Sequence, residues 1–108
     1  MISTISARRY AQAVFQIAQA KNKLDEWKGQ LDSIVTLMKD QQVCDIVENP
    51  KVSFNLKAEL FKQKLADADP TILNLCYLLI TKGKIKNAGQ IADEYAQLLD
   101  AHRGIKHA

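Results

Sequence analysis

Apolar residues recur at alternating steps of three and four along most of the chain, which is the spacing of one face of an α-helix. The most regular stretch surrounds the single tryptophan, with apolar residues at Leu24, Trp27, Leu31, Ile34 and Met38. A second stripe holds Phe54, Ala58, Phe61 and Leu65, and a third holds Ile85, Ala88, Ala92, Tyr95 and Leu99, widened by Ile91 and Leu98. Each stripe predicts an amphipathic helix with one face toward a shared core.

Residues that favour helix ends divide the chain into six segments. We expect the first helix to run from an N-cap at Ser3 or Thr4 to about Ala20, and the second to begin after a cap at Asn22. A short third helix fits residues 41–48. Pro50 forces the residue before it out of the helical region and so ends the third helix. Ser53 is the expected N-cap of the fourth helix, and Asp69-Pro70 is an N-cap followed by proline at the first position of the fifth. Gly83 marks a left-handed end of the fifth helix, and Gly104 ends the sixth.

Composition agrees with a helical protein of one domain. The 108 residues are 47% hydrophobic, enough for a core, and contain only 2 Pro and 4 Gly, which disfavours a turn-rich sandwich or barrel. No repeat or linker interrupts the six segments. The sequence therefore predicts an all-α fold, a single six-helix bundle over residues 1–104, with residues 105–108 beginning a linker to a further domain.

Two of the predicted helices have more apolar surface than a bundle requires. On a helical wheel the apolar arc of the first helix spans about 200°, roughly twice the width of a surface helix that faces one core. Its centre holds Ala7, Val14 and Ala18, one flank holds Ala11 and Phe15, and the other holds Tyr10, Ala13 and Ile17. The fifth helix is either the buried centre of the bundle or partly exposed, because Asn74 is the only polar residue between Ile72 and Ile80.

If these two helices are neighbours, their surplus flanks would line a groove for an amphipathic partner helix. Small side chains at Ala7, Ala11, Ala13 and Ala18 would let another backbone approach closely, although alanine at any one position is also explained by helix propensity. A central fifth helix wrapped by the other five remains the simpler alternative.

Charge and reactive side chains give no sign of chemistry. The formal net charge of +3 is small and dispersed, which argues against nucleic acid, and no segment is apolar for long enough to insert into a membrane. We interpret Cys44 and Cys76 as buried free thiols. His102 and His107 have no cysteine or carboxylate cluster at metal-ligand spacing beside them in the sequence. No serine has a nearby histidine base, and no phosphate-binding loop occurs. We expect no catalytic residue, no cofactor and no metal.

Several strings resemble the delta subunit of F-type ATP synthases, called the oligomycin sensitivity-conferring protein in mitochondria. The first string is Ala7-Arg8-Arg9-Tyr10-Ala11-Gln12-Ala13-Val14-Phe15-Gln16-Ile17-Ala18. The others, in the family's order, are Asn49-Pro50 with Ser53 and Lys57, then Asn74-Leu75 with Leu78-Leu79, then Lys82-Gly83-Lys84-Ile85, and finally Ile91, Tyr95, Leu98-Leu99-Asp100 and Arg103-Gly104-Ile105.

The resemblance implies the six-helix N-terminal domain of a non-catalytic subunit at the top of the peripheral stalk, on the cytoplasmic face of a bacterial plasma membrane. Its first and fifth helices would grip the N-terminal helix of an ATP synthase alpha subunit, and a missing C-terminal domain would meet the b-subunit stalk. The residues expected to contact the alpha subunit are Tyr10, Ala13, Val14, Ile17, Asn74, Leu75, Leu78 and Lys82.

Two other functions compete with this reading. A free-standing helical adaptor could use the same groove for an unrelated amphipathic helix. A helix-turn-helix DNA-binding protein built from the last two helices would need a basic recognition helix, but the last helix carries Asp93, Glu94 and Asp100.

Overall fold

The computed structural model describes residues 4–104, and the possible cap at Ser3 and the expected linker at 105–108 lie outside that range. The elements are α1 (Thr4–Ala20), α2 (Leu24–Leu37), α3 (Gln41–Glu48), α4 (Phe54–Lys64), α5 (Pro70–Thr81), the 3-10 turn η1 (Ile85–Asn87) and α6 (Ala88–His102). The described range contains six α-helices and no strand, so the predicted all-α class and helix number are confirmed.

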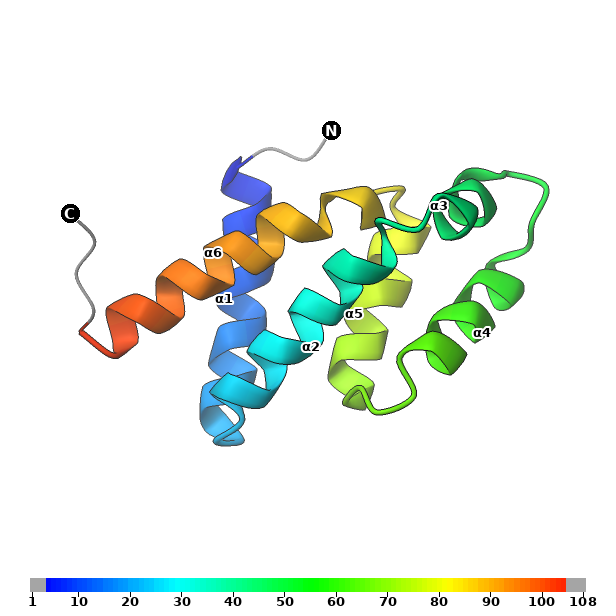
Figure 1. Ribbon diagram of the computed structural model, residues 1–108. Helices are drawn as coiled ribbons and strands as arrows, with labels where there is room; N and C mark the ends of the chain where they lie inside the picture. The colour runs from blue at the N-terminus through cyan, green and yellow to red at the C-terminus, as the bar shows by residue number, and fades with distance from the viewer. Residues whose placement is uncertain (1–3, 105–108) are drawn as a thin grey trace.

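The helices form an elongated body of 46 × 27 × 20 Å. α6 packs most extensively against α1 and also against α2, whereas α4 packs mainly against α5 (Figure 1). α1 and α5 are both upright in Figure 1 and run in opposite directions. α2 has close contacts with both of them, but α1 and α5 do not pack closely on one another.

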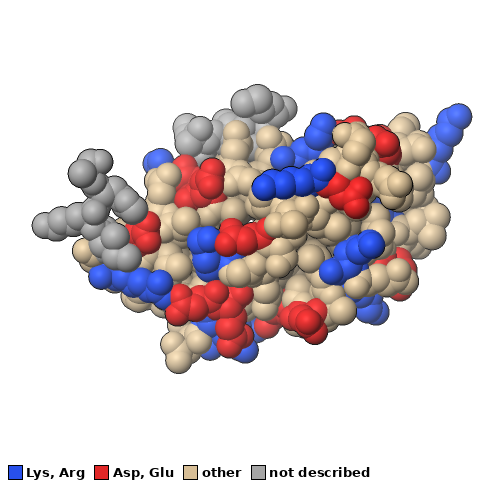
Figure 2. Space-filling view, viewed as in Figure 1, with Lys and Arg blue, Asp and Glu red and all other residues tan. Residues whose placement is uncertain are grey.

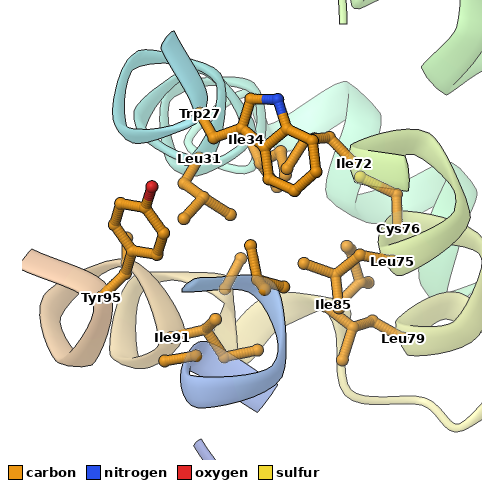
Figure 3. Packing of buried hydrophobic residues seen from close by; sticks show 14 of the residues in the cluster. Trp27, Leu31, Ile34, Ile72, Leu75, Cys76, Leu79, Ile85, Ile91 and Tyr95 are labelled. Carbon is orange, nitrogen blue, oxygen red and sulfur yellow. The ribbon is translucent and has the colours of Figure 1, made fainter. Parts of the chain in front are cut away.

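The core contains buried side chains from all six described α-helices and from η1. Trp27, Tyr95 and Phe61 are the largest side chains that are fully buried. Figure 3 shows Trp27 and Ile34 of α2 facing the α5 side chains, with Tyr95 of α6 on the other side of Leu31. The Tyr95 hydroxyl donates a hydrogen bond of 2.6 Å to the Leu24 carbonyl, which ties α6 to the first turn of α2.

The alanines of α1 have a different role from the one that the sequence suggested. Ala7, Ala11 and Ala18 are fully buried within the domain, and α1 packs most extensively against α6. Small side chains allow two helix backbones to approach closely, so these three alanines favour internal packing and not a partner's approach. Ala13 is the only one of the four that is exposed.

Most of the predicted helix ends are confirmed by hydrogen bonds. The Ser53 hydroxyl accepts from the Leu56 backbone N–H at 3.3 Å, and the Asp69 carboxylate accepts from that of Thr71 at 2.9 Å. Gly83 has a φ of 69°, and the N–H of the next residue donates to the Leu79 carbonyl at 2.7 Å. This 6→1 hydrogen bond is the Schellman arrangement that a left-handed residue after a helix permits.

The prediction that Asn22 caps the second helix is wrong. Asn22 has a φ of 58°, and the N–H of Lys23 donates to the Ala18 carbonyl at 2.8 Å. Asn22 therefore ends α1 in a second Schellman arrangement, because asparagine tolerates the left-handed conformation better than most residues with a side chain. Lys23 precedes α2 without a side-chain capping bond.

The apolar stripe of α4 is only partly buried. Phe61 is fully buried, but Phe54 is 43% exposed and Leu65 lies just beyond the end of the helix. The physical reason is that α4 packs closely on a single neighbour, α5, so its first turn is covered from one side only.

Candidate docking surface on α1 and α5

The eight residues expected at a partner interface do not all reach the surface. Val14 is 5% exposed and Leu75 is 8% exposed, so both belong to the core and could offer a partner only a small area. The other six are exposed or half-buried: Tyr10, Ala13 and Ile17 on α1, Asn74 and Leu78 on α5, and Lys82 at the end of α5. Their role in binding remains a prediction.

The apolar arc of α1 divides into a covered side and an open side. Phe15 on the covered side makes edge-on ring contacts with Tyr95 and His102 of α6, with ring centroids 5.7 and 5.8 Å apart. On the wheel, Tyr10 and Ile17 lie about 140° and 160° away from Phe15, on the opposite side of the core-facing alanines. Ile17 is 40% exposed. The structure thus covers the Ala11 and Phe15 flank and leaves the Tyr10, Ala13 and Ile17 flank open.

A shallow hollow lies on this open flank. Its volume is about 370 Å³, and its lining includes Ser6, Arg9, Tyr10 and Ala13. The small Ala13 side chain leaves space beside the Tyr10 ring, which suits the insertion of an apolar side chain from another molecule. Arg9 at the edge could place its guanidinium group near a carboxylate of that molecule.

α5 is likewise buried on one side and open on the other. The buried side carries Ile72, Cys76 and Leu79, all fully buried, whereas Leu78 on the other side is 42% exposed. The exposure of Leu78 excludes the alternative of a central helix wrapped on all sides. Asn74 is exposed one turn before Leu78, and Lys82 is exposed one turn after it. The open side of α5 therefore offers one large apolar side chain between two polar ones.

Two charged contacts join the middle and the C-terminal end of α6 to α1 and α2. Glu94 is 8% exposed and lies with its carboxylate 3.7 Å from the Arg8 guanidinium. Arg103, just after α6, forms an ion pair with Asp25 in the first turn of α2. The first contact joins α6 to the covered side of α1 and the second joins the end of α6 to α2, and because their partners are distant in the sequence, helical periodicity does not predict them.

The buried titratable groups support a structural role. Burial raises the pKa of the Cys76 thiol to about 12, so the thiol stays protonated and unreactive near neutral pH. Burial, assisted by Asp25 and opposed by Arg103, raises the pKa of Tyr95 to about 12.

Other kinds of site find little support in the described part of the chain. Residues 4–104 contain no group of three or more His, Cys, Asp or Glu side chains that could hold a metal ion, and His107 lies outside them. None of the described helices has the length and apolar character needed to cross a membrane. Positive and negative side chains are interspersed over the face seen in Figure 2, without the basic stripe that nucleic-acid binding requires.

Comparison with known proteins gives one consistent family. Residues 6–108 match the family model described as ATP synthase delta (OSCP) subunit. The ATP synthase subunit delta of Dehalococcoides mccartyi (strain ATCC BAA-2266 / KCTC 15142 / 195) is 32% identical over 102 residues, which cover 94% of this chain and 56% of that protein. That of Lysinibacillus sphaericus (strain C3-41) is 30% identical over 109 residues, covering 100% of this chain and 61% of that protein. The chain thus spans a little over half the length of these curated relatives.

Proposed function

The chain belongs to the ATP synthase delta (OSCP) subunit family, covering roughly the N-terminal half of such subunits, and on this premise we propose that it is an alpha-binding domain of the peripheral stalk. In this role it is a non-catalytic part of the stator of a bacterial F-type ATP synthase. The observation that carries the proposal is the pair of open apolar flanks on α1 and α5.

The occupant that best fits these flanks is the N-terminal helix of an alpha subunit. Tyr10, Ala13 and Ile17 follow one another at steps of three and four, so they form a continuous strip along α1. Since α1 and α5 do not pack closely on one another, the partner helix would have to reach from α1 to α5 for Leu78 to contact it as well. An amphipathic helix that lies along such a strip buries apolar anchors at its i, i+3, i+4 and i+7 positions.

The proposed function is mechanical. The catalytic head of a rotary synthase must be held against the torque of the rotor, so that rotation changes the conformation of the active sites. A strip of apolar contacts from which water is excluded resists shear and dissociates slowly, which suits a static joint. The domain would work at the cytoplasmic face of the plasma membrane, while the remaining half of the delta subunit would contact the b-subunit stalk.

The test is titration of this chain with a synthetic peptide of the cognate alpha-subunit N-terminus, for wild type, Ala13→Asp and Leu78→Asp. A carboxylate at either position stays hydrated in the free domain but loses that water against the apolar face of the peptide in the complex, which costs several kcal/mol. We expect both variants to weaken binding by about a hundredfold or more and to keep the wild-type circular dichroism spectrum.

Two variants on α1 serve as controls. Gln12→Asp places the same charge on the exposed polar arc and should bind the peptide normally. Val14→Asp places it in the core and should unfold the domain. If wild type does not bind the peptide at all, the alpha-subunit proposal fails and an adaptor for another helix becomes the better reading. If Ala13→Asp and Leu78→Asp both bind normally, the partner does not lie on these flanks.

A further inference from the structure

A second hollow lies between α4 and α5, away from the open flank of α1. Its volume is about 300 Å³, and its lining includes Phe54, Lys57, Ile80 and Thr81. On the α5 wheel Ile80 lies about 160° from Leu78. The exposed residues Asn74 and Thr81 lie on the surface between the two apolar sides of α5, so the two sides can be occupied independently.

The apolar part of this hollow includes an aromatic ring that the fold holds in place without covering it. Phe54 remains 43% exposed, yet its ring makes an edge-on contact with Tyr77 of α5, with centroids 6.1 Å apart and planes at 80°. Ile80 forms an almost fully buried part of the wall. A fixed, exposed aromatic beside a recessed aliphatic side chain is the kind of anchor site that is enriched at protein interfaces.

The charged part of the hollow is cationic. Lys57 lines the hollow and forms no ion pair with a residue in the described range, whereas Lys86 on η1 is paired with Glu48. The sequence has seven Lys and three Asp or Glu between residues 50 and 87, but six basic and six acidic residues before residue 50. The surroundings therefore favour an anionic ligand.

We propose that the α4–α5 hollow is a second docking site, which binds an acidic peptide segment of a partner protein. The peptide inserts one large apolar side chain, flanked by its own carboxylates, into the hollow. The hollow takes the apolar side chain beside Phe54, and a carboxylate of the peptide neutralises Lys57. A second copy of the chain fits less well, because a two-fold contact would bring the lysines of both copies together. A lipid surface fits less well because Ile80 is recessed instead of protruding.

The experiment compares two fluorescein-labelled helical peptides with the same leucine face, one with glutamates and one with lysines at the flanking positions. Fluorescence anisotropy should show that the 108-residue chain binds the glutamate peptide at least about tenfold more tightly than the lysine peptide, and more weakly as salt rises. Lys57→Glu should lose at least about tenfold in affinity, and Phe54→Ser a similar factor.

Ala13→Asp separates this site from the one on α1 and should bind the glutamate peptide normally. Equal binding of both peptides, or equal losses for Ala13→Asp and the Lys57 variant, would overturn the proposal, because binding would then be unselective or would take place on α1. Sedimentation with vesicles of one part phosphatidylglycerol to three parts phosphatidylcholine tests the lipid alternative. Vesicle binding that Phe54→Ser abolishes, without peptide binding, would also overturn it. Neither result bears on the alpha-subunit titration, so the two proposals can fail separately.

Discussion

Replacing Tyr95 by phenylalanine removes one hydroxyl from the centre of the fold and leaves the ring. The hydroxyl donates to the Leu24 carbonyl at 2.6 Å, and the ring is fully buried against Phe15. Loss of a buried hydrogen bond costs about 1 kcal/mol at neutral pH. For a domain of this size that corresponds to a fall of about 4 °C in the melting temperature.

The pH dependence makes this prediction sharper. Because burial raises the pKa of Tyr95 from about 10 to about 12, the neutral phenol is favoured in the folded state. The contribution of the hydroxyl is therefore complete below pH 10 and is lost as the pH rises from 10 to 12, at about 1.4 kcal/mol per pH unit. An advantage of about 1 kcal/mol of wild type over Tyr95→Phe should therefore vanish about 0.7 pH units above pH 10 and be reversed by pH 12.

The assay is urea unfolding of both proteins at a series of pH values, followed by the fluorescence of the buried Trp27. Lysine titration affects both proteins alike and cancels in the difference. Tyr77→Phe is the matched control, because the Tyr77 hydroxyl makes no hydrogen bond with another described residue, and it should change stability little. A difference between wild type and Tyr95→Phe that stays constant from pH 7 to pH 12 would refute the argument that Tyr95 is a buried neutral donor.

Two further predictions concern single positions. Gly83→Ala should destabilise the domain by about 1 kcal/mol, because the φ of 69° at this position is strained for a residue with a Cβ. Gly29→Ala lies inside α2 with nothing within 4 Å of the added carbon, and it should stabilise the domain by about 0.5–1 kcal/mol. Paired urea titrations measure both changes, and an unchanged stability of Gly83→Ala would contradict the left-handed helix end. Cys76 should react with iodoacetamide at pH 8 at least about tenfold more slowly than the half-buried Cys44, as followed by mass spectrometry of each peptide, and equal rates would mean that Cys76 is not buried in solution.

The sequence alone determined where most helices begin and end, because those signals act within a few residues. Ser53 and Asp69 bond to backbone groups two or three residues away, and Gly83 needs only its own left-handed conformation. The prediction for Asn22 is wrong because asparagine favours two competing roles, an N-cap in extended conformation and a helix end with positive φ. Only the backbone geometry around Asn22 distinguished them.

The same distinction applies to the candidate docking surface. Periodicity gave the width of the apolar arc on α1 and the excess of apolar residues on α5. It could not tell which part of each arc is covered, because the covering side chains come from distant parts of the sequence: Phe15 meets Tyr95 and His102. The family resemblance places Val14 and Leu75 among the partner-contact residues although both lie in the core, and periodicity places the exposed Phe54 in the core. Helical spacing is a property of the local chain, whereas burial depends on which helix packs against which face, and only the tertiary structure decided that.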